Sequence, residues 1–548
     1  VMKTWQIAHT YDDKDFEINR FIEDLLVYRR ITTRSERQNF LSPTNPIEFT
    51  AKDVGVNQVQ LNKAIARIKE AIEKKQSIVV YADYDADGVT AGAILWETLW
   101  SLGAQVMPYI PHRVDEGYGL SLKGIDNVRE QFDPALIITV DQGVTAQKQV
   151  AYAKSLGIEV IVTDHHVLPK TLPDCLMVHT TMLSGSGVSW FLAKEILKTK
   201  NDNNFNKEHE DRLALAALGT VADLLPLTGV NRSIVKYGLE AMRKTKRVGL
   251  VALLKESGVT QDSITPYNIS HGLAPRLNAM GRLEHALDAL RLLCTKNEEK
   301  AKILSEKLGF TNKERQKITE DTVIHAKGLV VEDDAKLLFV GDASYNQGII
   351  GLVAGKLVEQ YYKPSIVVSI GEEFTKASAR SIVGFNIVEA IRECQDLLID
   401  VGGHPMAAGF TVATKNIDAL KLKLLEIAKR DISEEMLQKK LRVDAEIPLS
   451  AVTLDLYNAI QQLLPFGQGN YEPVFATKQV KVTEARLVGA TGKHVKLRVG
   501  GVDAIAFGMG DLYGKLNEKP LVDIAYGIDL NVWNGTKKLQ LVVKDILL

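Results

Sequence analysis

The sequence predicts two successive α/β domains, joined by a helical linker and followed by a small β-barrel. Three observations support this fold class. Short apolar runs alternate with helical patterns from about residue 75 to residue 230, and a second alternation of this kind begins near residue 336. From about residue 440 the pattern changes to short strands separated by Gly and Asn-Gly turns. The length of 548 residues agrees, because domains average roughly 150 residues.

The first alternation predicts a doubly wound parallel sheet. Its apolar runs are continuous rather than alternating, which is typical of strands covered by helices on both faces. The expected strands comprise residues 77–81, 104–110, 135–140 and 159–162, and the expected helices comprise residues 90–102 and 147–155.

A charged stretch over residues 296–327 predicts one or two long, largely solvated helices between the domains. The second α/β domain then follows. Its expected strands cover residues 336–340 and 364–369, its expected helices cover residues 347–360 and 386–397, and residues 402–412 precede a last helix through Lys429.

The C-terminal region contains five or six short strands, for which an OB-fold barrel is the natural candidate. The strands lie within residues 474–489, 494–500, 502–508, 521–533 and 538–548. We therefore expect an N-terminal segment packed on the first domain, the first α/β domain, a helical linker, the second α/β domain and an OB-like nucleic-acid-binding domain, at residues 1–60, 61–295, 296–330, 331–432 and 433–548, respectively.

Overall charge does not single out a function class. Lys and Arg number 67 and Asp and Glu number 68, so the formal net charge is 67 − 68 = −1, which excludes a globally basic, histone-like protein. Residues 476–548 carry 11 basic and 7 acidic residues, a local balance of 11 − 7 = +4. A local basic region of this kind leaves a polyanionic substrate open.

Cysteine content and hydropathy point to the cytoplasm. The three cysteines are far apart and include no CxxC pair, which disfavours a disulfide framework or a thiolate zinc site. No apolar run approaches the roughly 18 residues of a membrane span, and the polar N-terminal residues do not resemble a signal peptide. We therefore expect a cytoplasmic protein without membrane association.

Acidic and histidine side chains follow three of the expected strands. They are Asp83, Asp85 and Asp87 after the first strand, Asp141 after the third, and His165 and His166 after the fourth; Asp223 ends a run of helical apolar residues. Because ligands of an open parallel sheet bind outside the carboxyl ends of the strands, we expect these side chains to share one crevice. So many carboxylates need a compensating cation, and a mixed carboxylate and imidazole set suits Mn²⁺ or Mg²⁺. Two such ions would activate a water and stabilise both oxygens of a displacement at phosphorus.

Each of these motifs has a structural alternative. An EF-hand calcium loop also begins D-x-D-x-D-G, but with Asp83 at position one the twelfth position is Ile94 instead of Glu. An acid after a strand is often a helix N-cap, which remains open for Asp141, and a His-His pair is more often structural or surface-exposed. Four such elements in one α/β unit favour a common site over coincidence.

The ordered motifs resemble those of the DHH phosphoesterase superfamily. The first domain contains DYDADG, VDQG, DHH and ADLLPL in this order, and the second contains GGHPMAAGF, which is similar to the signature of the DHHA1 domain. The segments PRLNAMGR, PHRVDEGYGL and LPFGQGN, and the OB-like GKHVKLRV and AIAFGM, resemble the RecJ branch of this superfamily. The resemblance covers nearly the whole chain, from about residue 25 onward.

The resemblance implies a metal-dependent exonuclease that degrades single-stranded DNA from 5′ to 3′ into mononucleotides, in DNA repair and recombination. Residues 61–295 would be its catalytic domain, with two ions of Mn²⁺ or Mg²⁺. By motif position, the metal ligands would be Asp83, Asp85, Asp87, Asp141, His165 and Asp223. Asp87, His166 and His404 would be catalytic, with His166 either a ligand or a donor to the scissile phosphate. Each ligating histidine would need an acceptor for its second ring nitrogen, which the sequence does not identify.

The same resemblance implies the residues that contact the substrate. Arginine suits bidentate phosphate recognition, although a surface salt bridge is the commoner role of any one arginine. The expected phosphate contacts are Arg113, Arg276, Arg282, Ser378, Arg380 and His404, with Ser378 and Arg380 in a glycine- and serine-rich loop. The expected nucleic-acid contacts of the barrel, unless they form only a solvated face, are Lys493, Lys496, Arg498 and the group Trp533, Lys537 and Lys538. Candidate partners are single-stranded DNA, a helicase and a single-strand-binding protein.

Two departures from the family pattern bear on substrate contacts and not on hydrolysis. Tyr345-Asn346 stands where the family often has Trp-His, and Asn386 stands where histidine is frequent. An alternative function is a phosphoesterase acting on short oligoribonucleotides or cyclic dinucleotides, whose known members are typically shorter chains without an OB-like segment. A DNA-binding scaffold without catalysis is a further alternative, but it predicts eroded metal ligands and none is missing.

Overall fold

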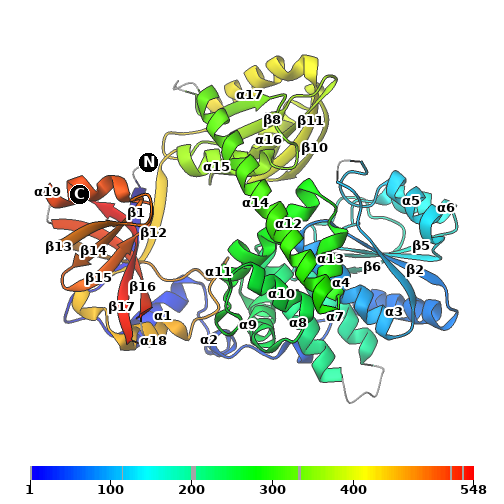
Figure 1. Cartoon of the computed structure of the whole chain (residues 1–548), viewed down its shortest axis with the longest axis horizontal. Helices are drawn as coiled ribbons and strands as arrows, with labels where there is room; N and C mark the ends of the chain where they lie inside the picture. Colours follow the sequence, from blue (N-terminus) through cyan, green and yellow to red (C-terminus); the bar gives the residue numbers. More distant parts are fainter. Residues whose placement is uncertain (1–2, 114, 199–204, 331–334, 519–520, 534–535) are drawn as a thin grey trace. The chain divides into compact units, whose positions relative to one another are not determined.

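The computed structural model describes residues 3–113, 115–198, 205–330, 335–518, 521–533 and 536–548 (Figure 1). These residues form two compact units. Unit 1 comprises Val1–Tyr28, Glu314–Gln461 and Pro473–Leu548, and unit 2 comprises Arg29–Lys313 and Gln462–Glu472. Among the described residues, every helix is too short or too polar to span a lipid bilayer.

Unit 2 contains a five-stranded sheet whose strands are all parallel, in the order β3-β2-β4-β5-β6. The strands are β2 (Ser77–Ala82), β3 (Gln105–Tyr109), β4 (Leu136–Val140), β5 (Glu159–Asp164) and β6 (Leu176–His179). One face is covered by α3 (Gln58–Glu73), α4 (Ala86–Ser101) and α7 (Gly185–Leu197), and the other by α5 (Leu122–Phe132) and α6 (Gln147–Ser155). The predicted doubly wound sheet is confirmed, whereas β6 and α5 were not predicted.

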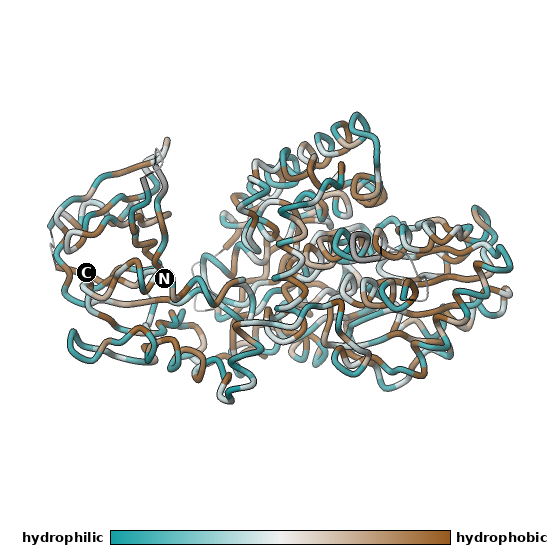
Figure 2. The backbone as a smooth tube through the Cα atoms, turned by 90° about the horizontal axis from the view of Figure 1, so that it is seen from below, coloured by the Kyte–Doolittle hydropathy of each residue, from teal (hydrophilic) through white to brown (hydrophobic). Residues whose placement is uncertain are grey.

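Alternation along the strands explains the two covered faces. Ile78 and Val80 point into the core under α4, whereas Val79 and Tyr81 point into the core under α5 and α6, and all four side chains are fully buried. Because successive side chains of a strand point to opposite faces, an apolar run is needed when both faces are covered. In Figure 2 the strands of this sheet are mostly brown, which marks hydrophobic residues.

A helical layer completes unit 2 (Figure 1). Its helices are α8 (Phe205–Ala222), α9 (Gly229–Lys244), α10 (Val248–Glu256), α11 (Pro266–Asn268), the π-helical turn η3 (Ile269–Leu273), α12 (Ala274–Leu283) and α13 (Leu287–Cys294), with α2 (Arg34–Leu41) and the 3-10 turn η1 (Pro46–Glu48) against α9. Helices α8 and α12 both pack on α4. This packing brings residues far apart in the chain to the end of β2.

A single long helix, α14 (Glu298–Leu329), spans 32 residues. The sequence predicted one or two helices over residues 296–327, and the structure has one. Three of its apolar side chains, Ile303, Phe310 and Ile324, are more than 60% exposed, which agrees with a largely solvated helix. The first half of α14 belongs to unit 2 and the second half to unit 1.

The second α/β domain, in unit 1, contains a five-stranded sheet in the order β10-β11-β9-β8-β7, in which only β7 and β8 are parallel. Its elements are β7 (Leu338–Asp342), α15 (Ile350–Tyr361), β8 (Ser365–Ser369), β9 (Phe374–Arg380), α16 (Ile387–Arg392), β10 (Leu398–His404), β11 (Ala407–Ala413) and α17 (Ile417–Asp431).

Two expectations for this domain were wrong in detail. The helix expected over residues 386–397 ends at Arg392 and is followed by the 3-10 turn η4 (Gln395–Leu397). Ser378 and Arg380 lie on β9 and not in a loop. The small residues that suggested a loop alternate instead between the two faces of the strand, where buried Ala377 and Ala379 leave room for the packed helices.

The C-terminal part of unit 1 is a closed five-stranded barrel, as predicted. Its strands are β13 (Phe475–Val488), β14 (His494–Val499), β15 (Val502–Ala506), β16 (Leu521–Trp533) and β17 (Thr536–Leu547), with α19 (Tyr513–Glu518) between the third and fourth. The pairing runs β13-β14-β15-β17-β16, and β16 returns to β13 to close the barrel. The parallel pair β15–β17 and the position of α19 are those of an OB-fold.

The N-terminal strand β1 (Lys3–Thr10) extends the barrel sheet. It pairs in parallel with β12 (Lys439–Glu446), which pairs in turn with β13. Trp5 Nε1 donates a hydrogen bond of 2.8 Å to Asp545, and Phe21 of α1 (Ile18–Tyr28) packs on Phe475 at 5.2 Å between ring centroids. Packing of the whole 1–60 segment on the first domain was therefore a wrong expectation for its first 28 residues. The alternating, half-buried pattern of β1 needs a sheet edge, which β12 provides.

Candidate metal centre and nucleic-acid interface

The candidate ligands of unit 2 gather at the carboxyl ends of β2, β4 and β5. These strands are adjacent, and the winding of the chain reverses between β2 and β4. In an open parallel sheet this switch point is where ligands bind. Three overlapping trios of side chains there place potential ligand atoms within 4.8 Å of one another: Asp83, Asp85 and Asp141; Asp87, His165 and Asp223; and Asp141, His165 and His166. The structure thus brings together all seven side chains of the predicted centre.

The loop over residues 83–85 connects β2 to α4. Asp85 is the N-cap of α4, and its side chain accepts a hydrogen bond of 2.9 Å from Gly88 N. Asn278 of α12 accepts a hydrogen bond of 2.7 Å from Ala86 N and so holds the loop from outside the sheet. Sequence reasoning gave Asn278 no role, although its position within the PRLNAMGR motif was a usable signal.

Asp87 lies in the first turn of α4 and is buried. Its two carboxylate oxygens accept hydrogen bonds from Gly185 N (2.7 Å) and Ser186 N (3.0 Å) at the N-terminus of α7. The positive end of the α7 dipole stabilises a carboxylate at this place. Gly219 of α8 passes so close that a Cβ there would lie 2.3 Å from Oδ1 of Asp87. Two helices therefore hold this carboxylate in one orientation.

Asp141 follows β4 in a left-handed backbone conformation, with a φ of 62°. Non-glycine residues rarely adopt this conformation, and those that do cluster at functional sites. The side chain is buried, and among the described residues its Oδ1 has an ion-pair contact with His165 and accepts no hydrogen bond. The helix N-cap interpretation is wrong for Asp141, because Ala146 occupies that position at α6.

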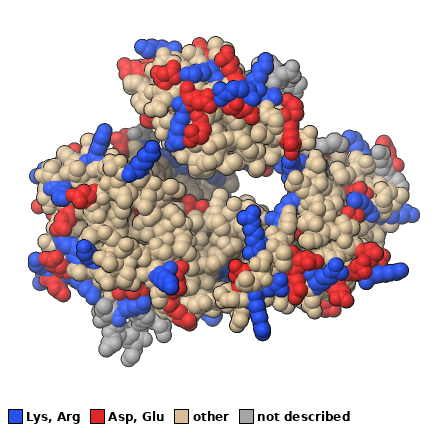
Figure 3. Space-filling model, turned by 180° about the vertical axis from the view of Figure 1, so that it is seen from behind, with Lys and Arg blue, Asp and Glu red and all other residues tan. Residues whose placement is uncertain are grey.

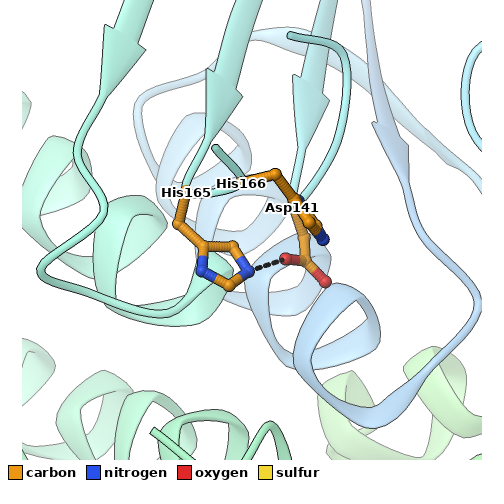
Figure 4. A group of neighbouring side chains, drawn as sticks. All are labelled: Asp141, His165 and His166. Atoms are coloured by element: carbon orange, nitrogen blue, oxygen red, sulfur yellow. Dashed lines mark ion pairs between the residues drawn. The ribbon is translucent and has the colours of Figure 1, made fainter. Parts of the chain in front are cut away.

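His165 and His166 follow β5, and Figure 4 shows both histidines beside Asp141. His165 Nε2 lies 3.1 Å from Asp141 Oδ1 and 3.5 Å from Asp223 Oδ2. One imidazole nitrogen thus lies between carboxylates that come from the sheet and from the helical layer. This arrangement is typical of ligands that share a cation.

His166 is oriented by the first residue of the DHH motif. Its Nδ1 lies 2.7 Å from Asp164 Oδ1. Asp164 also accepts hydrogen bonds from the backbone N of His165 (2.7 Å), of His166 (3.1 Å) and of Val144 (2.9 Å). Asp164 is therefore the acceptor for the second ring nitrogen of His166 that the sequence did not identify.

Asp223 comes from a different part of the fold. It follows the last residue of α8, and its side chain is 31% exposed. Asp223 N donates to Gly219 O (2.9 Å), and the next residue, Leu224, turns the chain with a φ of 59°. A left-handed residue of this kind commonly ends a helix.

Burial and mutual repulsion disfavour the ionised carboxylates of the cluster. Burial, followed by the charge of Asp85, raises the pKa of Asp83 well above its usual value. Burial, followed by the charge of Asp87, likewise raises the pKa of Asp141, and raises the pKa of Asp223 to about 8. A divalent cation among these oxygens would offset both causes. The buried Oδ1 of Asp141, next to the His165 ring, and the oxygen and nitrogen donor set fit Mn²⁺ or Mg²⁺.

Two of the predicted phosphate-binding arginines in unit 2 lie near the cluster. The guanidinium carbon of Arg113 is 5.2 Å from the centroid of the Tyr84 ring, and its charge opposes the rise in the pKa of Asp83 that burial causes. The charge of Arg282 likewise opposes the rise in the pKa of Tyr84 that burial causes. Both cations therefore act on the loop that carries the first three carboxylates.

Arg276 is engaged elsewhere. Its Nη1 donates to Gly272 O (2.8 Å) and its Nη2 to Glu256 O (3.2 Å). Glu256 is the last residue of α10, whose carbonyl end attracts a cation. These contacts indicate a structural role, and a phosphate contact by Arg276 stays a prediction.

In unit 1, Ser378 and Arg380 lie beside the first turn of α15. A Cβ on Gly351 would lie 2.9 Å from Ser378 Oγ and 3.0 Å from Arg380 Nη2. Arg380 Nη1 donates to Ser378 Oγ (3.2 Å). A guanidinium, a hydroxyl and a helix N-terminus together can bind a phosphate. His404 ends β10 of the same sheet and is exposed.

The departures from the family pattern have local structural roles. Tyr345 is 4% exposed, and its hydroxyl lies 2.9 Å from Nδ1 of His325 on α14. Asn346 Oδ1 accepts a hydrogen bond of 2.7 Å from Gly348 N, and Asn386 is the N-cap of α16. The side-chain contacts of all three residues are therefore explained by the fold itself.

The predicted basic contacts of the barrel differ in their surroundings. Arg498 on β14 stands between Glu484 of β13 and Asp503 of β15, with its Nη1 3.8 Å from Glu484 Oε1. Lys496 lies opposite another basic residue, Arg486 of β13. Lys496 therefore adds to a local positive charge, whereas Arg498 is balanced by acids. Across the face drawn in Figure 3, basic and acidic side chains are likewise interspersed.

An aromatic pair at one end of β14 and β15 was missed by sequence reasoning. The rings of His494 and Phe507 meet edge to face at 5.4 Å between centroids, and Phe507 is 59% exposed. Lys493 directly precedes the pair in the chain. An exposed aromatic ring next to basic residues on an OB-like barrel is typical of base stacking, which was the available signal. The side chain of Trp533, also predicted to contact nucleic acid, lies outside the described residues.

Three family models match separate parts of the chain. The DHH family, N-terminal domain, matches residues 77–220; the DHHA1 domain matches residues 334–430; and the RecJ OB domain matches residues 443–545. The first match contains β2 to α7 and most of α8, and therefore every candidate metal ligand except Asp223.

Similar proteins and solved structures agree with these matches. The chain is 36% identical to the single-stranded-DNA-specific exonuclease RecJ of Bacillus subtilis, over 99% of this chain and 70% of that protein, and 34% identical to RecJ of Thermus thermophilus, over 89% and 71%. The crystal structure of Thermus thermophilus RecJ in complex with Mn²⁺ superposes with a TM-score of 0.82 at 28% identity, covering 99% of this chain and 79% of that chain. A structure of exonuclease RecJ bound to manganese has a TM-score of 0.60 at 34% identity and covers 68% and 94%.

Proposed function

This chain belongs to the RecJ family of single-stranded-DNA-specific exonucleases, and on that basis we propose that it hydrolyses single-stranded DNA from the 5′ end and releases mononucleotides. One observation carries the proposal. Seven carboxylate and imidazole side chains from three strand ends and two helices converge in unit 2, in overlapping trios whose potential ligand atoms lie within 4.8 Å. The proposed biological setting is DNA repair and recombination.

The proposed metal ligands are the six side chains predicted by motif position. Bound among Asp83, Asp85, Asp87, Asp141, His165 and Asp223, two ions of Mn²⁺ or Mg²⁺ would supply an activated water and charge stabilisation at phosphorus. The protein supplies orientation: the α7 N-terminus fixes Asp87, and the α4 N-terminus fixes Asp85. Fixed ligands reduce the reorganisation that the reaction needs.

His166 is the proposed donor to the scissile phosphate. Its Nδ1 is held by Asp164, which leaves Nε2 as the ring nitrogen for a substrate, and its side chain is 47% exposed. The hydrogen bond with Asp164 raises the pKa of His166 to about 9, which favours the protonated imidazole. A protonated Nε2 can donate to a phosphate oxygen as negative charge develops there.

Several further residues would hold the DNA strand. We propose that Arg113 and Arg282 contact phosphates in unit 2, and that Ser378, Arg380 and His404 contact phosphates in unit 1. The support is the guanidinium and hydroxyl beside the α15 N-terminus, and the two cations around Tyr84. The barrel would bind the strand through Lys493, Lys496 and Phe507. A helicase that produces single strands and a single-strand-binding protein in the cytoplasm are the proposed partners.

The test of this function uses 5′-labelled single-stranded DNA and Mn²⁺. The wild-type protein should release labelled mononucleotide before label appears in any shorter oligomer. Release from the 3′ end first, or an intact strand after long incubation, would refute the proposal. A parallel incubation with a dinucleotide separates this function from a phosphoesterase of short oligoribonucleotides.

The Asp87→Asn variant gives the first prediction. Because Asp87 is both a proposed ligand and a partner of the α7 N-terminus, kcat should fall by more than the roughly 10–100-fold typical of losing an outer-shell partner. Asp126→Asn is the matched control, since Asp126 is an exposed carboxylate of the same unit that accepts a hydrogen bond from the Tyr152 hydroxyl. Equal kcat for the two variants would contradict the assignment of Asp87.

A further inference from the structure

The segment Gln462–Glu472 is assigned to unit 2, although the residues on both sides of it belong to unit 1. It contains the LPFGQGN motif, for which neither the metal centre nor the barrel gives a reason. We propose that this segment, called the strap below, positions Asp223 of the metal centre. The inference rests on the proposed nuclease function and adds positioning residues to it.

The strap is anchored by a buried arginine whose guanidinium donates hydrogen bonds to three backbone carbonyl groups. Arg232 of α9 is 1% exposed and lies 3.8 Å from the centroid of the Phe40 ring. Its Nη1 donates to Leu463 O (3.0 Å) and its Nη2 to Leu464 O (2.6 Å), while its Nε donates to Phe40 O (2.6 Å). A guanidinium with three backbone acceptors fixes the start of the strap against the first turn of α9.

A buried asparagine closes the strap on itself. Asn470 is fully buried, and its Nδ2 donates to Leu463 O (2.9 Å) and Pro465 O (2.8 Å), while its Oδ1 accepts from Arg29 Nη1. Gly467 and Asn470 also exchange two backbone hydrogen bonds, of 2.9 and 3.2 Å. The strap therefore has a defined shape and is not a loose linker.

The strap contacts the turn that follows Asp223. Gln468 O accepts a hydrogen bond of 2.7 Å from Leu227 N, the donor that the turn between α8 and α9 does not satisfy internally. A Cβ on Gly469 would lie 2.9 Å from Pro226 Cβ, and a Cβ on Gly467 would lie 2.6 Å from Leu227 Cδ1. The two glycines thus let the strap backbone approach residues three and four positions after Asp223.

Asp223 needs such support more than the other ligands do. The others are fixed by strand ends of the sheet or by helix N-termini, whereas Asp223 follows the end of α8 and precedes the left-handed Leu224. Backbone carbonyls of the strap accept hydrogen bonds from Leu227, at the end of that turn, and from Arg232 of the following helix. It therefore limits where the Asp223 carboxylate can lie relative to His165, 3.5 Å away.

The experiment compares Gly469→Ala with Gly157→Ala in the full chain. Both glycines have positive φ angles, +71° for Gly469 and +79° for Gly157, so both variants carry backbone strain. Of the two added Cβ atoms, only the one at residue 469 would have a neighbouring atom within 4 Å. Mn²⁺ affinity is measured by calorimetry and by electron paramagnetic resonance, and DNA affinity is measured without metal. For Gly469→Ala we expect weaker Mn²⁺ binding and a lower kcat, each by about 10–100-fold, with KM and metal-free DNA affinity within about twofold of wild type.

Gly467→Ala is the second variant, because its backbone conformation is not restricted to glycine and its Cβ would displace Leu227, the residue that donates a hydrogen bond to the strap. We expect weaker Mn²⁺ binding for this variant as well. It decides the question alone if Gly469→Ala does not fold. The inference is overturned if both strap variants bind Mn²⁺ as Gly157→Ala does. If the wild type does not degrade DNA, the proposed function fails, while the Mn²⁺ affinities still test the strap separately.

Discussion

Asp164 illustrates how one residue can serve a metal centre without binding metal. Its two oxygens accept four hydrogen bonds, from the backbone of residues 144, 165 and 166 and from the His166 ring. Although burial acts in the opposite direction, the hydrogen bonds with His166 lower the pKa of Asp164. The carboxylate is therefore ionised and accepts hydrogen bonds at both oxygens, which gives the first residue of the DHH motif an orienting role in this chain.

The Asp164→Asn variant should lose activity without losing substrate affinity. The amide has one acceptor oxygen, so the ring of His166 and the three backbone donors cannot all be satisfied. We expect kcat to fall about 10–100-fold with KM nearly unchanged. The control is Asp174→Asn, an exposed residue of the following loop whose side chain is 92% exposed. A kcat within twofold of wild type would contradict the orienting role of Asp164.

His209 on α8 is a buried imidazole that should limit stability in acid. It is 1% exposed, and burial, followed by the charge of Arg212, lowers its pKa from 6.5 to about 4. As the pH falls, the unfolded chain therefore takes up this proton before the folded protein does. Above pH 6.5 the neutral His209 does not reduce the free energy of unfolding. As the pH falls to about 4, the free energy of unfolding decreases by up to about 3 kcal/mol because of this group.

The His209→Phe variant removes this titration. Between pH 7 and pH 4.5, its free energy of unfolding should fall less than that of the wild type, by an amount approaching about 3 kcal/mol. Urea unfolding at the two pH values measures the difference, and His271→Phe serves as an exposed control. Parallel losses in wild type and variant would show that another group dominates the acid limit.

At the scale of elements, continuous apolar runs were the most reliable signal. β2 to β5 and α6 appear where the sequence predicted them, because a strand covered on both faces must be apolar throughout. The edge strand β6 has only four residues, of which one is buried, so its pattern carried too little information. The helix expected over residues 386–397 was too long, since periodicity alone does not mark the point where α16 stops at Arg392.

The exposed ring of Phe507 is the candidate surface for base stacking on the barrel. Phe507→Ala should weaken metal-free binding of single-stranded DNA by roughly 1–3 kcal/mol per stacked base, or about 5–150-fold. Arg498→Gln should change the affinity little, because Glu484 and Asp503 already balance this arginine on the neighbouring strands. Fluorescence anisotropy with a labelled oligonucleotide measures both. Stronger loss for Arg498→Gln than for Phe507→Ala would reverse our assignment.

For the whole molecule, the order of domains and the convergence of the ligands were predictable, and two long-range connections were not. The ligands converge because parallel strands end at the same edge of a sheet, which local patterns reveal. The pairing of β1 with β12 and the docking of the strap join residues more than 200 positions apart. Local periodicity shows that a face is covered but does not identify the distant segment that covers it.

The path of the chain between the units determines what a single cut in the backbone would separate. The chain passes from one unit to the other four times, at residues 28/29, 313/314, 461/462 and 472/473. If a protease cut α14 at its midpoint, each of the two fragments would still contain part of both units. β1 of the first fragment would stay paired with β12 of the second, and the strap of the second would stay bonded to α9 of the first. After such a cut, the two fragments would therefore be held together by non-covalent contacts within each unit.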